Sequence, residues 1–257
     1  MSFHLMGTGL RGIESLTLEE SSVLEKCDRI YVDTYTSIFP PEFTDSLIKK
    51  YQNRVMALQR ETLESMSFLD GSHGDFALLV SGDPFGSTTH FTLITECKNR
   101  GINIKIYENA SILGIIPGRT GLSAYRSGTI VSIPDFGETH IPLSPYIKIL
   151  ENINSALHTL ILIDLKNGKN VKSPRILQIL EQIRNKYSLE DILNRPSFSI
   201  EKAGWPGERV RVGSLKELLS MELESPYCMV MPGKVDHNEL SNILSLFPDS
   251  INLWNQA

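Results

Sequence analysis

Residues 76–93 read FALLVSGDPFGSTTHFTL, and this stretch decides the class of fold that the sequence predicts. Its first five residues are apolar and indicate a short buried strand. The turn that follows is rich in small residues and contains Asp83-Pro84, and a helix is expected to begin near Thr88. A strand, a glycine-rich turn and a helix in this order are typical of an open parallel sheet, in which ligands bind beyond the carboxyl ends of the strands.

The same alternation extends over residues 1 to about 110. The expected strands are SFHLM, RIYV, RVMAL, FALLV and IKIY, and the expected helices are TLEESSVLEKC, EFTDSLIKKY, ETLESMSFLDG and TTHFTLITECKNRG. Continuous apolar strands between helices predict a parallel sheet that is covered on both faces. After the glycine-rich segment 109–121, which we take as the domain junction, the order changes. Strands are then expected within 129–133, 158–164, 196–204 and 227–233, and helices within 145–156, 173–186, 214–221 and 237–246.

Composition narrows the functional classes. The 257 residues are 41% hydrophobic and 21% charged, with a net charge of −5, which argues against a general nucleic-acid binder. The sequence shows neither a secretory signal nor an apolar run long enough for a membrane helix. The cysteines 27, 97 and 228 are scattered, so we expect reduced thiols in a cytoplasmic protein. No histidine or cysteine has metal-ligand spacing, and we predict no metal.

A second glycine-rich turn, GTGLRG at 7–12, matches the G-x-G-x-x-G pattern of dinucleotide-binding folds, and Asp33 follows at a plausible distance. In those folds the glycines open the helix that binds the pyrophosphate. Here Thr17 and Glu20 have the spacing of a capping box, which places the helix start about ten residues after Gly7. A dinucleotide-dependent oxidoreductase is therefore a minor alternative. Instead, we expect the turns at 7–12 and 81–87 to meet at one edge of the sheet.

The turn SGDPFGSTTH also resembles the G-D-P-x-x-x-T-T-H signature of diphthine synthases, a branch of the class III, tetrapyrrole-methylase-like S-adenosylmethionine methyltransferases. Further matches follow in the family's order along the whole chain. They are GTGLRGIESLT, DTYTS, NASILGIIPGRTGLSAYRSG, LHTLILID, KAG and MPGK. Each piece alone is a weak signal, but their joint order is specific to this family.

The resemblance implies two α/β domains, residues 1–110 with a mainly parallel sheet and residues 111–257 with a mixed sheet. It also implies a homodimer and S-adenosylmethionine in the cleft between the domains, with S-adenosylhomocysteine as product. Carried over position by position, it implies a cofactor site of eight residues. They are Leu10, Asp83, Gly86, Ser111, Ile112, Ile163, Ala203 and Tyr227. Core packing is the alternative role for the aliphatic members, Ile163 above all.

The activity that the resemblance implies is repeated methylation, predicted to end at a trimethylammonium. The acceptor is the amino group of 3-amino-3-carboxypropyl-histidine on translation elongation factor 2, in diphthamide biosynthesis. The expected partner is that protein, without direct contact to nucleic acid or membrane. Three alternatives stay open: a tetrapyrrole methyltransferase acting on carbon of a uroporphyrinogen or corrin, the oxidoreductase, and a non-catalytic protein of the diphthamide pathway. The sequence leaves open whether a methyl ester is also made.

Methyl transfer to an amine does not require a strong general base. Alignment of the reacting atoms at about 3–3.5 Å supplies roughly 7–11 kcal/mol. Deprotonating an amine whose pKa lies between about 8 and 10.4 costs roughly 1.4–4.6 kcal/mol at pH 7, so positioning should dominate. Five side chains near the predicted site are candidates for contact with substrate, and none is assigned as catalytic. They are Asp33, Tyr35, His90, Arg119 and Arg126.

Overall fold

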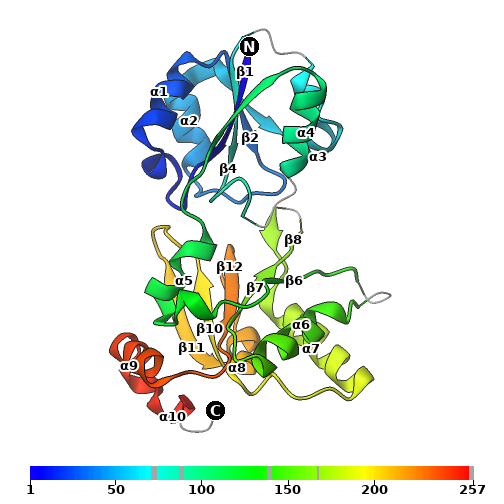
Figure 1. The fold of residues 1–257 in the computed structure, drawn as a ribbon, viewed down its shortest axis with the longest axis vertical. Coiled ribbons are helices and arrows are strands. Elements are labelled where there is room, and N and C mark those ends of the chain that lie inside the picture. Colours follow the sequence, from blue (N-terminus) through cyan, green and yellow to red (C-terminus); the bar gives the residue numbers. More distant parts are fainter. Residues whose placement is uncertain (71–73, 87–89, 138–140, 167, 255–257) are drawn as a thin grey trace. The chain divides into compact units, whose positions relative to one another are not determined.

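The structure is a computed structural model that describes residues 1–70, 74–86, 90–137, 141–166 and 168–254. The chain forms two compact units, Met1–Gly114 and Ile115–Ala257. Each unit is built on its own five-stranded sheet with helices packed against it (Figure 1). The α/β fold with one parallel and one mixed sheet confirms the fold class that the sequence predicts.

The first unit contains a parallel sheet in the order β3-β2-β4-β1-β5. Its strands are β1 Ser2–Gly7, β2 Arg29–Asp33, β3 Val55–Leu58, β4 Phe76–Val80 and β5 Asn103–Tyr107. Its helices are α1 Leu18–Lys26, α2 Phe43–Tyr51, α3 Arg60–Ser65 and α4 Phe91–Asn99. All five strands lie within or next to the runs predicted for them. The predicted helix start near Thr88 lies outside the described residues.

Helices cover both faces of this sheet because its strands are apolar on both sides. Along β4, Phe76, Leu78 and Val80 belong to one buried cluster, whereas Ala77 and Leu79 belong to another. This period of two is the ordinary alternation of side chains along a strand. The first cluster packs against α3 and α4 and the second against α1 and α2, as Figure 1 shows.

The second unit contains a mixed sheet in the order β11-β10-β12-β7-β6, in which only β6 and β7 are parallel. Its strands are β6 Val131–Ile133, β7 Thr159–Ile163, β10 Pro196–Glu201, β11 Arg209–Ser214 and β12 Tyr227–Met231, and β8 Leu165–Lys166 pairs with β9 Lys169–Asn170 in a separate ribbon. Its helices are α6 Ser144–Asn154, α7 Ser173–Tyr187, α8 Leu215–Ser220, α9 His237–Leu246 and α10 Ile251–Trp254. A large apolar cluster fills the space between the sheet and α6, α7 and α8.

Two parts of the structure differ from what the patterns indicate. β11 was not expected, because two of the six residues in its sequence RVRVGS are arginines. It is an edge strand that pairs only with β10, so its charged residues stay accessible. The junction segment 109–121 forms the helix α5, Ile112–Thr120, across the boundary between the units.

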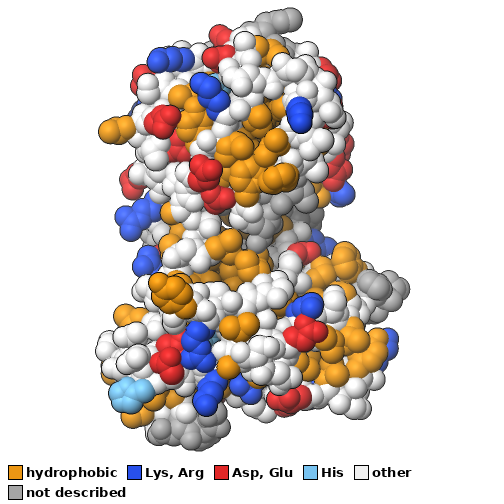
Figure 2. Space-filling view, viewed as in Figure 1, with side chains coloured by type: hydrophobic (Ala, Val, Ile, Leu, Met, Phe, Trp, Pro, Cys, Tyr) orange, Lys and Arg blue, Asp and Glu red, His pale blue; other side chains and the backbone are white. Residues whose placement is uncertain are grey.

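On the face drawn in Figure 2, basic and acidic side chains are interspersed. This face therefore offers no continuous basic surface of the kind that nucleic-acid binders use.

Candidate functional site

The two glycine-rich turns of the first unit meet directly. The backbone N–H of Gly9 donates to the carbonyl of Gly82 at 3.1 Å, and the N–H of Gly82 donates to the carbonyl of Gly9 at 2.9 Å. A Cβ on Gly7 would lie 2.4 Å from the carbonyl oxygen of Gly82, so a side chain there would force the turns apart. The predicted convergence of both turns at one sheet edge is confirmed. Leu10, a predicted cofactor residue, follows this contact and is half-buried.

The helix start confirms that the first turn is not a dinucleotide site. Thr17 caps α1 by accepting a hydrogen bond from the N–H of Glu20, and the Glu20 carboxylate accepts from the N–H of Thr17. A short 3₁₀ helix, Gly12–Ser15, separates the glycines from this cap. The N–H groups of the first turn of α1 therefore do not face the glycines, as pyrophosphate binding would require.

Asp83 and Gly86 shape the second turn. The Asp83 carboxylate accepts hydrogen bonds from the N–H of Phe85 at 2.8 Å and from the N–H of Asn109 at 3.3 Å. The N–H of Gly86 donates to the carbonyl of Asp83 at 3.1 Å. Asp83 thus holds its own turn and also ties it to the segment that follows β5.

Asn109 is a site residue that sequence reasoning missed, since it was considered only as the first residue of the junction segment 109–121. Its Nδ2 donates to the carbonyls of Gly7 at 3.1 Å and Ser15 at 3.0 Å and to Oε2 of Glu20 at 3.3 Å. Burial raises the pKa of Glu20, against the hydrogen bonds that it accepts from Thr17 and Asn109. The available signal was its position directly after the last parallel strand, where polar side chains gather at a ligand edge.

The junction segment completes this edge within the first unit. Ser111 lies 3.5 Å from the position that a Cβ on Gly82 would take and 3.6 Å from that of a Cβ on Gly86. Ile112 is the next residue and the first of α5. Four of the five predicted residues of the first unit, Asp83, Gly86, Ser111 and Ile112, therefore lie together, and Leu10 follows the glycine contact that joins the turns.

The predicted residues of the second unit also share one edge of their sheet. Asn170 links two of them, because its Nδ2 donates to the carbonyl of Ile163 at 2.7 Å and its Oδ1 accepts from the N–H of Tyr227 at 2.9 Å. Ala203 follows β10, in which Glu201 is paired with Tyr227. Ile163 is 5% exposed and belongs to the main apolar cluster. Asn170 was not predicted, because the sequence KNGKN at 166–170 is typical of a polar, solvated turn.

Tyr227 uses its side chain inside the unit. Its hydroxyl donates to the carbonyl of Val171 at 2.6 Å, and burial raises its pKa above the usual range. The ring is buried in the main apolar cluster, so the side chain offers a ligand little surface. A backbone contact is therefore the form in which Tyr227 can serve the predicted site.

Asp33 and His90 form a buried pair that joins two loops of the first unit. Nε2 of His90 lies 3.1 Å from Oδ2 of Asp33, and Nδ1 lies 3.1 Å from the carbonyl oxygen of Pro84. Burial alone would raise the pKa of Asp33, but hydrogen bonds from His90 and Thr36 outweigh it and hold the pKa below its usual value. Both ring nitrogens of His90 thus face acceptor oxygens. Neither side chain has a free position for a substrate proton.

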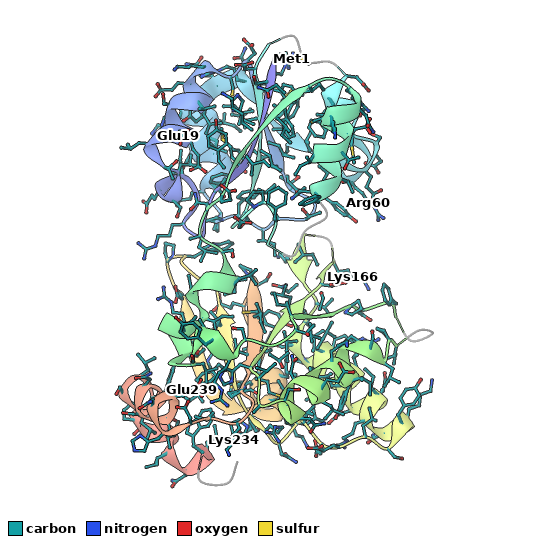
Figure 3. The ribbon with its side chains drawn as sticks, viewed as in Figure 1. Met1, Glu19, Arg60, Lys166, Lys234 and Glu239 are labelled. Carbon is teal, nitrogen blue, oxygen red and sulfur yellow. The ribbon has the colours of Figure 1, made fainter. Side chains whose placement is uncertain are left out.

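The two candidate arginines are engaged within the second unit. Arg119 forms an ion pair with Glu208, which also accepts from the N–H of Gly204 beside Ala203. Nη1 of Arg126 lies 2.7 Å from Oε2 of Glu239. Arg126 therefore stabilises the start of α9, where Figure 3 labels Glu239. Tyr35 is 37% exposed beside the Asp33 turn.

A donor such as S-adenosylmethionine fits the chemistry of these edges. Glycines and Ser111 keep side-chain bulk small at the edge of the first unit, and aliphatic residues offer apolar contact. Within the described residues, no group of three or more His, Cys, Asp or Glu side chains is placed to hold a metal ion.

Comparisons with known proteins identify the family of this chain. The sequence profile of the family described as Tetrapyrrole (Corrin/Porphyrin) Methylases matches residues 2–219. A diphthine synthase of Thermoplasma acidophilum is 34% identical over 255 residues, which cover 99% of this chain and 98% of that relative. The chain belongs to the tetrapyrrole methylase family, in its diphthine synthase branch. As a member of this family, the protein is an S-adenosylmethionine-dependent methyltransferase.

Two further relatives extend the comparison. Diphthine methyl ester synthase 2 of Candida albicans is 32% identical over 268 residues, which cover 96% of this chain and 89% of the relative. A solved structure of a diphthine synthase superposes with a TM-score of 0.85 and 24% identity, covering 100% of both chains. The fold is therefore that of the tetrapyrrole methylase family over its whole length.

Proposed function

We propose that this methyltransferase acts in diphthamide biosynthesis, where it methylates the amino group of 3-amino-3-carboxypropyl-histidine on translation elongation factor 2. The observation that carries the proposal is the 34% identity to a diphthine synthase over 99% of the chain. The relatives reported above bear diphthine synthase names, which favours this substrate over a tetrapyrrole. Repeated transfer to a trimethylammonium is the expected end point.

We further propose that the eight residues predicted from the sequence bind S-adenosylmethionine. In support, Asp83, Gly86, Ser111 and Ile112 form one edge of the first unit, and Ile163, Ala203 and Tyr227 share one edge of the second. The donor supplies an activated methyl group. The protein's part is to hold the acceptor nitrogen in line with it and to exclude competing nucleophiles.

The proton released by the acceptor amine leaves to solvent in this mechanism. Asp33 already accepts from the backbone N–H groups of Tyr35 and Thr36, each at 2.9 Å, and from His90. Both ring nitrogens of His90 are occupied by contacts at 3.1 Å, one with Asp33 and one with the carbonyl oxygen of Pro84. A neutral amine at pH 7 costs roughly 1.4–4.6 kcal/mol, which is less than alignment supplies.

Mass spectrometry of the acceptor tests this function. Elongation factor 2 carrying the aminocarboxypropyl-histidine is incubated with the protein and S-adenosylmethionine, and its mass should rise in steps of one methyl group. Mild alkali then separates the two chemistries, because it removes a methyl ester but not N-methyl groups. No gain on this acceptor, together with methylation of uroporphyrinogen III in a parallel reaction, would replace the proposal by the tetrapyrrole alternative.

We also propose a cytoplasmic homodimer. Three buried thiols support a reducing compartment, since Cys27, Cys97 and Cys228 are all free. In the part of the chain that the structure describes, no helix combines the length and apolar character of a membrane span. Light scattering coupled to gel filtration measures the mass in solution, and a monomer would contradict the dimer while leaving the activity untouched.

A further inference from the structure

A cavity of about 310 Å³ lies in the second unit, at the edge of the sheet opposite to the proposed cofactor edge. It is bounded where β10 begins, at Arg195 and Pro196, and where β12 ends, at Gly233 and Lys234. The proposed cofactor residue Tyr227 is at the other end of β12, about 13 Å away along the strand. The last residues of the MPGK motif line this cavity, and the proposed methyl transfer assigns no role to this motif.

The lining of this cavity is cationic. Arg195 and Lys234 both contribute to it, and none of its lining residues is an Asp or Glu. Neither side chain forms an ion pair within the described residues, whereas other arginines of the unit, such as Arg126, do. Lys234 is labelled in Figure 3, just beyond the end of β12.

Arg195 carries a second and independent sign of a ligand. Its Nε is buried and has no hydrogen-bond partner among the residues that the structure describes. A buried donor without an acceptor destabilises a fold, and the cost is larger for a charged group. A bound anion that accepts hydrogen bonds from Arg195 would explain why this buried donor has no acceptor within the described part of the protein.

The remaining walls are apolar. Trp254 is 9% exposed, and its indole N–H is already satisfied by the hydroxyl of Ser250 at 3.1 Å, so its ring offers apolar surface. Leu240 and Ile153 add aliphatic contact. The size of the cavity lies at the lower end of the range for small-molecule sites.

We propose that this cavity binds a small organic anion, a carboxylate or phosphate group attached to an apolar or aromatic body. The guanidinium of Arg195 pairs with two oxygens of the anion, because its planar donors match both carboxylate and phosphate. Lys234 supplies a second charge, and Trp254 contacts the apolar body. This proposal does not rest on the methyl acceptor or on the cofactor site.

Phenyl phosphate, phenylacetate and the neutral phenol are the probes for a titration followed by the two indole N–H signals in ¹H–¹⁵N NMR. A Trp205→Phe variant assigns the signal of Trp254. The signal of Trp254 should move with at least one of the two anions and stay in place with phenol. Comparison of phenyl phosphate with phenylacetate distinguishes a phosphate ligand from a carboxylate ligand.

Variants that remove a charge test whether Arg195 and Lys234 bind the anion. Arg195→Gln and Lys234→Gln should each weaken binding about tenfold, because each removes a charge-assisted contact. Lys216→Gln is the matched control, since Lys216 is exposed on α8 and outside the cavity lining. Calorimetry with S-adenosylmethionine should give the same affinity for wild type and Arg195→Gln, which separates this site from the proposed cofactor site.

A thermal melt separates a ligand-binding arginine from a structural one. Without ligand, Arg195→Met should melt at the same or a higher temperature than wild type, because the unpartnered buried donor is gone. A clear fall in melting temperature would assign Arg195 to the fold instead. Equal binding of both anions to wild type and to the Arg195→Gln/Lys234→Gln double variant, or no shift at Trp254 with either anion, would overturn the proposal.

Discussion

Replacing Asn109 tests whether one amide holds the ligand edge of the first unit together. Its Nδ2 donates to two backbone carbonyls and to the Glu20 carboxylate. Asn109→Ala removes these hydrogen bonds, at about 1 kcal/mol each, so the free energy of unfolding should fall by about 3 kcal/mol at pH 7. Asn109→Asp keeps the shape of the side chain but replaces the donor by a carboxylate.

The aspartate variant should be the less stable of the two at neutral pH. Its new oxygen would stand where Nδ2 now lies 3.3 Å from Oε2 of Glu20. Two charges at that separation repel by roughly 4–5 kcal/mol at an effective dielectric constant near 20. The pair can avoid this by binding one proton, which for a carboxyl with a pKa near 4.3 costs about 4 kcal/mol at pH 7 and about 1 kcal/mol at pH 5.

The pH dependence has a definite sign. The folded variant binds a proton that the unfolded chain releases, so the carboxyl pKa is raised on folding and stability falls as the pH rises above about 4.3. Burial already raises the pKa of Glu20 in the wild type, which acts in the same direction. The gap between the aspartate and alanine variants should therefore shrink from about 4 kcal/mol at pH 7 to about 1 kcal/mol at pH 5.

Urea unfolding followed by far-ultraviolet circular dichroism at both pH values measures this gap. Asn53→Asp is the control, because Asn53 is exposed in a 3₁₀ turn and its substitution should change stability little at either pH. Equal unfolding midpoints for the two Asn109 variants at pH 7 would refute the reasoning, as would a gap that is the same at pH 5.

Three other substitutions follow from buried contacts. Asp33→Asn should lower the unfolding free energy by about 3–5 kcal/mol at pH 7 in urea titrations; because folding lowers the pKa of Asp33, the wild-type advantage should vanish as the pH falls below about 4, and an advantage that persists there would contradict the ion pair. Arg126→Ala removes the ion pair with Glu239 and should lower the free energy of unfolding by about 2–3 kcal/mol, measured by a thermal melt. The KM for the methyl donor should not change. Lost turnover at unchanged stability would instead place Arg126 at the substrate. Tyr227→Phe removes the hydrogen bond to the Val171 carbonyl and should cost about 1–3 kcal/mol by urea unfolding, and an unchanged midpoint would show that water replaces the hydroxyl.

Local patterns were sufficient for the parts of the structure that depend on neighbours in sequence. The apolar run FALLV predicts β4, and the spacing of Thr17 and Glu20 predicts the cap of α1, because both signals act over a few residues. β11 was missed because two arginines interrupt its apolar residues, which an edge strand tolerates. Its strand conformation comes from pairing with β10, which lies outside any short window.

The side-chain partners within the site were not predictable by the same means. Asn109 contacts residues 89 to 102 positions away, and His90 reaches Asp33 across 57 positions. Their residue types alone are compatible with several roles for Asn109, His90 and Asp33. The contact between the two glycine turns was predictable, because parallel strands end at one edge and glycines permit close approach there.

The two buried histidine–carboxylate pairs show why residue type alone could not assign roles. In the second unit, Nδ1 of His158 accepts from the N–H of Gly233 at 3.2 Å, and Nε2 lies 2.7 Å from Oε1 of Glu239. In the first unit, both ring nitrogens of His90 lie 3.1 Å from acceptor oxygens, one of Asp33 and one of Pro84. In each pair the second ring nitrogen contacts a backbone group, so neither histidine has a nitrogen free to take a proton from a substrate. A methyl transfer supported by such a framework must draw its rate from alignment, so variants that loosen the turns should slow it more than variants that change charge at the site's rim.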